Sequence, residues 1–162
     1  MRGERRSARA TAAGLLIGIG MGGFVDGIVL HQIAQWHQML SNIIPPHTVD
    51  AMRMNMTWDG LFHGLTWVIT LVGILQLRSA AYTRDPIPSA QVFTGQLILG
   101  WGIFDLVEGV IDHQILGLHN VREVPNYTTY NLTFLAVWGV LFIPVGWFLM
   151  RAGGGGGMEA RR

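Results

Sequence analysis

Residues 24–39 read FVDGIVLHQIAQWHQM, and residues 106–121 read LVEGVIDHQILGLHNV. At matching offsets the two stretches share a valine, a glycine, a His-Gln pair, an isoleucine and a second histidine, and Asp26 corresponds to Glu108. Polar residues repeated in this order argue against coincidence in an apolar background. We therefore interpret the chain as two copies of one unit.

Four long apolar stretches contain this repeat, at about residues 12–39, 57–77, 92–118 and 130–150. A helix needs about 20 mostly apolar residues to cross the bilayer core, and each stretch meets that length. We predict an all-α polytopic membrane protein whose four transmembrane helices form two repeated pairs. Two helices per unit preserve orientation, so the halves should be related by an axis along the membrane normal, with the first and third helices facing each other.

The composition excludes several classes of protein. The chain has 162 residues, of which 50% are hydrophobic and 13% charged, with a formal net charge of +1. This balance provides no field for steering onto nucleic acid. Cysteine is absent, which excludes disulfides, thiolate nucleophiles and thiolate metal sites.

The arginines predict the orientation. Nine of the 11 precede the first stretch, lie between the second and third, or follow the fourth, whereas Arg53 and Arg122 fall in the other two connections. The positive-inside rule then places both termini in the cytoplasm. We expect a basic cytoplasmic N-terminus at 1–11, the transmembrane domain at 12–151 and a flexible glycine-rich tail at 152–162. A removable signal peptide fits poorly, because the first stretch is too long and carries Asp26 and His31.

Ionisable residues are unusually common in these stretches. Each costs about 2.5–3.5 kcal/mol near the bilayer centre. The predicted orientation places all of them in the outer half of the bilayer or at its edge, as one layer made of Asp26, Asp59, Asp105, Glu108, Asp112, His31, His37, His63, His113 and His119. No arginine lies within a span to balance the acids, which favours a bound cation.

The spacing suggests how the layer divides its roles. Histidines six residues apart cannot chelate one ion from an unbroken helix, so we expect one ligand from each of three helices: His31, His63 and His113. The acids would complete or orient this set, namely Asp26, Asp59, Glu108 and Asp112. His37 and His119, with nearby methionines, would deliver the metal from outside.

The ligand types leave the metal open among copper, zinc, iron and manganese. The run MRMNM at 52–56, predicted in an external loop, and Met39 add soft thioethers, which favour copper. A heme held by the repeat-related His31 and His113 is a less favoured alternative, since the surrounding acids would face an anionic macrocycle.

Three motifs carry a family resemblance: DGIVLHQ at 26–32, WDGLFHG at 58–64 and EGVIDHQILGLH at 108–119. They resemble an uncharacterised bacterial family of small four-helix integral membrane proteins, known as a domain of unknown function, over Gly14 to Met150. The resemblance implies a multi-pass protein of the bacterial inner membrane. The association of such proteins with cytochrome oxidase copper-assembly membrane proteins agrees with copper, and implies partners in metal handling or respiration besides the lipid bilayer.

Other functions remain open at this point. A small proton-coupled transporter would use the same layer for titration. A site open only toward the outer face argues against transport. A metal-bound water could hydrolyse a lipid or peptide at the outer surface, although no HExxH motif is present. The acids and histidines could also serve only to tie the helices together.

Overall fold

The computed structural model describes residues 2–159, with side chains from Ala8 to Gly153. Within this part the chain is entirely helical apart from its connections. It forms four rods: α1 (Arg2–Val25) continued by the π-helical η1 (Asp26–Ile33); α2 (Val49–Tyr82); α3 (Ala90–Glu108) continued by the π-helical η2 (Gly109–Ile115); and α4 (Tyr127–Phe134), the π-helical η3 (Leu135–Leu141) and α5 (Phe142–Glu159) in succession.

Each rod contains a segment long and apolar enough to cross a membrane. These segments are Ala8–Ile33, Val49–Tyr82, Ala90–Ile115 and Tyr127–Gly153. The predicted all-α fold with four membrane-spanning helices is therefore confirmed. The origin of the two halves by duplication stays a prediction.

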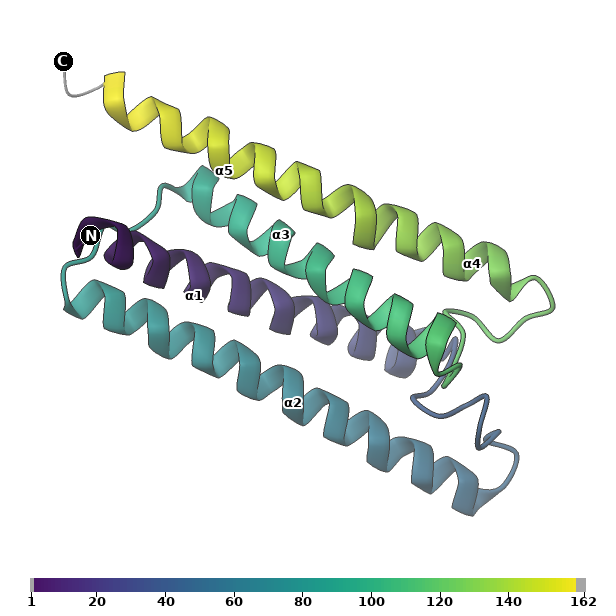
Figure 1. Ribbon diagram of the computed structural model, residues 1–162. Coiled ribbons are helices and arrows are strands. Elements are labelled where there is room, and N and C mark those ends of the chain that lie inside the picture. Colours follow the sequence, from purple (N-terminus) through teal and green to yellow (C-terminus); the bar gives the residue numbers. More distant parts are fainter. Residues whose placement is uncertain (1, 160–162) are drawn as a thin grey trace.

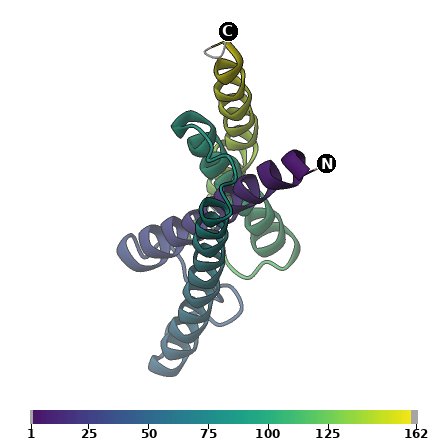
Figure 2. The same cartoon turned by 90° about the vertical axis from the view of Figure 1, so that its left-hand side faces the viewer.

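The rods that carry the sequence repeat form the centre of the molecule. α1 packs against both α2 and α3, and α3 packs against α1 and α5. Figure 2 shows α2 and α5 extending to opposite sides of this central pair. Small residues allow the close approach: a Cβ added at Gly18 would collide with the backbone of Leu97, and one at Gly100 with the backbone of Leu15.

Both long connections between helices lie at one end of the bundle. The start of α1, the end of α5 and the α2–α3 connection lie at the opposite end (Figure 1). The two connections at the first end are residues 34–48 and 116–126. They follow η1 and η2, so they bring the ends of the two repeated stretches together.

The first and third rods end earlier than the sequence suggested. We expected helices to Met39 and Leu118, but η1 ends at Ile33 and η2 at Ile115. Gln35 and Gly117, at equivalent repeat positions, take left-handed φ values of 50° and 58°. The terminating backbone bonds also correspond: the N–H groups of residues 34 and 116 donate to the carbonyls of residues 29 and 111, at 2.7 and 2.8 Å. A left-handed residue stops a helix.

The second rod begins earlier than expected, at Val49 rather than at about residue 57. Thr48 caps this end, because its hydroxyl accepts from the Ala51 N–H at 3.2 Å. The methionine run at 52–56 therefore lies in the first turns of α2 and not in a loop, which corrects the expectation. On a helix, Met52 and Met56 share one face and Met54 points elsewhere.

The last rod runs further than expected, from Tyr127 to Glu159 rather than from 130 to 150. The backbone is thus helical over most of the predicted tail 152–162, and residues 160–162 of that tail lie outside the described residues, as does Met1 of the predicted N-terminus.

Candidate metal centre

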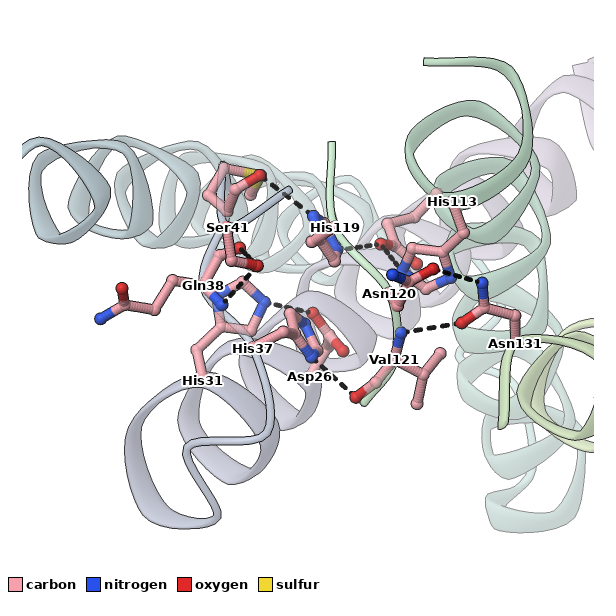
Figure 3. A network of polar contacts seen from close by, with 12 residues as sticks. Asp26, His31, His37, Gln38, Ser41, His113, His119, Asn120, Val121 and Asn131 are labelled. Carbon is pink, nitrogen blue, oxygen red and sulfur yellow. Dashed lines mark hydrogen bonds and ion pairs between the residues drawn. The ribbon is translucent and has the colours of Figure 1, made fainter. Parts of the chain in front are cut away.

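The early helix ends fold each second histidine back onto the first. The His37 ring lies 4.2 Å from the His31 ring, and the His119 ring lies 4.7 Å from the His113 ring, between centroids. Figure 3 shows the resulting group of imidazoles. The expectation that histidines six residues apart cannot share an ion assumed an unbroken helix, and that assumption is wrong for both pairs.

Two overlapping sets of side chains have metal-binding geometry. One ligand atom from each of His31, His37 and His119 lies within 4.8 Å of the other two, and the same holds for Glu108, His113 and His119. All five residues are buried. The set draws on η1, the end of α3, η2 and both connections, so it forms only when the two repeated halves pack together.

The Nδ1 atom of each histidine in the first set is held by an acceptor. His37 Nδ1 donates to the Val121 carbonyl at 2.8 Å, and His119 Nδ1 donates to the Met39 carbonyl at 3.1 Å. A carbonyl only accepts, so these rings carry their proton on Nδ1. His31 Nδ1 lies 2.9 Å from Asp59 Oδ1 and donates to it. The nitrogen left for a metal is therefore Nε2 in all three rings.

The two carbonyl contacts are reciprocal between the halves. His37 and His119 occupy equivalent repeat positions, and each donates to the carbonyl two residues beyond the other. Sequence reasoning did not identify the carbonyls of Met39 and Val121 as partners, because these contacts are made by the backbone and not by the side chains. Met39 and Val121 are the last residues of the two repeated stretches, and this equivalence is the signal that could have found them.

The available nitrogens are buried among acceptors. His37 Nε2 has no hydrogen-bond partner among the described residues, although His37 is only 3% exposed. Burial, together with the neighbouring His119 and His31, lowers the pKa of His37 well below its usual value. A neutral ring in this place offers a free lone pair.

Three carboxylates surround the imidazoles. Asp26 Oδ2 lies 3.2 Å from His31 Nε2, and Glu108 Oε1 lies 3.0 Å from His113 Nε2 and 3.2 Å from His119 Nε2. Asp59 Oδ1 also accepts from the Met39 N–H at 2.8 Å, which fixes it as an acceptor toward His31. In the part of the chain that the structure describes, no arginine forms a salt bridge with these acids, which leaves their charge to be balanced by protons or a cation.

Four predicted site residues lie outside both metal-binding sets. Asp26 and Asp59 still contact His31, whereas His63 and Asp112 interact elsewhere. His63 Nδ1 donates to the Asp59 carbonyl one turn earlier, at 2.7 Å, and its ring packs against Gly27. Asp112 is half-buried, and its carbonyl accepts from the Leu118 N–H at 2.8 Å in the turn that ends η2. The structure therefore brings together seven of the nine predicted residues: Asp26, His31, His37, Asp59, Glu108, His113 and His119.

The geometry does not fit the alternative of a heme between His31 and His113. The rings of His37 and His119 fill that space, stacked on each other at 4.5 Å with an interplanar angle of 4°. His37 lies against His31, and His119 lies against His113. A macrocycle would have to displace both rings together with their reciprocal hydrogen bonds.

A cavity of about 720 Å³ reaches His37 at the end of the bundle that carries the two long connections. Its lining includes Met52 and Met56 of α2, His47 of the first connection and Glu123 of the second. Met54 is absent from the lining, and Met39 is buried. The thioethers that reach this cavity are therefore two of the four methionines considered from the sequence.

Comparison with known proteins identifies the family of this chain. Residues 13–153 match the family described as "Predicted membrane protein (DUF2243)". The chain belongs to this family. The family description names a membrane protein and gives no function. The resemblance to an uncharacterised family of membrane proteins, inferred from the sequence motifs, is confirmed. No curated protein and no solved structure matches the chain.

Proposed function

We propose that this protein binds one transition-metal ion through the Nε2 atoms of His31, His37 and His119, at the end of the bundle that faces outward from the cell. The observation that carries the proposal is the common orientation of the three rings. Each donates from Nδ1 to a fixed oxygen, and one ligand atom of each ring lies within 4.8 Å of those of the other two. Metal-binding histidines characteristically donate their second N–H in this way, which sets the tautomer and the ring plane.

Glu108 is the fourth ligand in this proposal. Its Oε1 already lies 3.2 Å from His119 Nε2, and its Oε2 has no hydrogen-bond partner within the described chain. His113 Nε2 lies 3.0 Å from the same Oε1 and either holds the carboxylate or replaces it on the ion. Three imidazoles and a carboxylate suit zinc, copper or iron.

Copper is the ion to test first. Met52 and Met56 lie one turn apart on α2 and line the cavity that ends at His37. Soft thioethers at the approach and imidazoles at the destination fit the handling of copper. In this proposal the cavity is the route by which copper reaches the centre, in a protein of the bacterial inner membrane that works with partners in metal handling or respiration.

Metal stoichiometry of detergent-purified protein tests the proposal. We expect about one bound copper per chain after loading and desalting, and loss of stoichiometric binding in the double variant His37→Ala, His119→Ala. His63→Ala is the matched control, because His63 is another spanning-helix histidine whose Nδ1 donates to a carbonyl, but it lies outside both sets.

Each alternative predicts a different result. If His63→Ala lost copper and the double variant kept it, the ligands would instead be His31, His63 and His113, the set expected from the sequence spacing. If wild-type protein bound no copper, zinc or iron, the acids and histidines would instead serve proton-coupled transport or hold the helices together.

A further inference from the structure

A second cavity, of about 400 Å³, lies between η1, α3 and the α4–η3 rod. Its walls are mainly apolar, and five aromatic residues contribute to them: Trp36, Trp101, Tyr130, Phe134 and Trp138. Trp101 and Trp138 are stacked with their rings 5.9 Å apart. Because most of the lining belongs to membrane-spanning segments, a ligand would reach this cavity from the lipid.

Two buried carboxyl groups break the apolar character of this cavity. Asp26 lines it from η1 and Asp105 lines it from α3. Asp105 is 1% exposed, and its Oδ2 has no hydrogen-bond partner among the side chains that the structure describes, although Trp101 interacts with the same carboxyl group. A buried polar atom without a hydrogen-bond partner destabilises the fold, so this oxygen is a candidate to bind a ligand.

Asp105 has no role in the proposed metal centre. It belongs to neither metal-binding set. Its repeat equivalent is Gly23, which packs against Thr66 and Phe104. The carboxyl group is thus present in one half only, on the side where the cavity lies. Asp26 is shared, since it lines the cavity and also approaches His31 at 3.2 Å.

We propose that this cavity binds a lipid-soluble hydroquinone, with its ring against the aromatic walls and a hydroxyl group hydrogen-bonded to Asp105. A hydroxyl both donates and accepts, so it satisfies Asp105 in either protonation state. The volume lies within the range of small-molecule pockets and suits a substituted ring with the beginning of its tail. An acyl chain would leave Asp105 without a partner.

The test compares two ligands of the same shape in wild-type protein. One is a hydroquinone with a ten-carbon tail, kept reduced under anaerobic conditions, and the other is its di-O-methyl ether, which has no donor. Binding is followed by quenching of tryptophan fluorescence, because three tryptophans line the cavity. We expect saturable binding of the hydroquinone, at least about tenfold tighter than binding of the ether, or about 1.4 kcal/mol.

Asp105→Leu should reduce the affinity for the hydroquinone to that for the ether. Gln96→Leu is the matched control, since it also replaces a fully buried polar side chain of α3, but outside the cavity, and it should keep the wild-type preference. Equal binding of the two ligands by wild-type protein, or an unchanged preference in Asp105→Leu, would overturn the proposal. The ligand pair decides the question in wild-type protein even if the leucine variant fails to fold.

We expect the hydroquinone and the metal to bind independently. The double variant His37→Ala, His119→Ala should still prefer the hydroquinone, and Asp105→Leu should still bind metal. Loss of the hydroquinone preference in the histidine variant would contradict a site built on Asp105, whereas loss of metal there with the preference intact supports both proposals.

Discussion

Asp59 makes the two halves of the site unequal. Its Oδ1 accepts both from His31 Nδ1, at 2.9 Å, and from the Met39 N–H, at 2.8 Å. The equivalent position in the second half is Leu135. His113, the repeat partner of His31, accordingly has an Nδ1 atom without a hydrogen-bond partner in the described part of the chain. One acid thus fixes the ring orientation of only one of two related histidines.

Replacing this acid tests its orienting role. Asp59→Asn should weaken metal affinity about 10- to 100-fold, the usual cost of losing the partner of a ligating histidine. Competition with a chelator of known affinity measures the change. Asp112→Asn is the control, because Asp112 is an acid of the same layer whose carboxyl group, unlike that of Asp59, makes no hydrogen bond to a histidine within the described chain. Equal losses in the two variants would show a general charge effect and contradict the specific role.

At this scale the sequence indicates which residues gather better than how they are arranged. The repeat and the excess of acids and histidines in the spans pointed to one layer, and seven of the nine predicted residues meet there. The sequence favours His63 as a ligand because it lies on a third helix. It suggests a delivery role for His37 because His37 lies six residues from His31. Both choices followed from treating the helices as continuous to Met39 and Leu118.

At the scale of elements, the decisive feature is the left-handed residue that ends each repeated helix. Gly117 was a visible stop signal, because glycine is common in this position. Gln35 carries no such signal, and only its alignment with Gly117 reveals it. Without these two turns, His37 and His119 would continue along their helices and the reciprocal hydrogen bonds to Val121 and Met39 would not form.

Gly117→Ala should therefore destabilise the protein by about 1–2 kcal/mol, the cost of a left-handed conformation for a residue with a Cβ. Nothing lies within 4 Å of the added Cβ, so the effect is confined to the backbone. Gly60→Ala is the matched control: its Cβ also meets open space, but Gly60 lies within α2, where alanine is neutral or stabilising by up to about 1 kcal/mol. Denaturant unfolding in detergent measures both, and equal stabilities would contradict the assignment of this turn.

At the scale of the whole molecule, four helices place the imidazole cluster at one end and most arginines at the other. Arg78 lies near the end of α2 and Arg84 lies in the α2–α3 connection. That connection is at the end of the bundle that holds the start of α1 and the end of α5 (Figure 1). Arg53 and Arg122 lie at the end with the site. Helix number and order followed from hydropathy alone, since spans of this length leave few alternatives. The contact between the two halves could not be read from hydropathy, because it depends on small residues and on loop geometry.

The orientation is testable because the chain contains no cysteine. A single cysteine at Arg53 should react with a membrane-impermeant maleimide in intact spheroplasts, whereas one at Ser89 should react only after permeabilisation. Both positions are exposed, which makes the pair comparable. The opposite labelling pattern would place the metal centre on the cytoplasmic side.

The most direct measurement of the metal centre is X-ray absorption spectroscopy of the copper-loaded, detergent-purified protein. We expect a shell with three histidine imidazoles at about 2.0 Å, with multiple-scattering features that disappear in the His37→Ala, His119→Ala variant and persist in His63→Ala. A shell of sulfur or of water oxygens without imidazole scattering, or a spectrum that is unchanged by loss of His37 and His119, would contradict it.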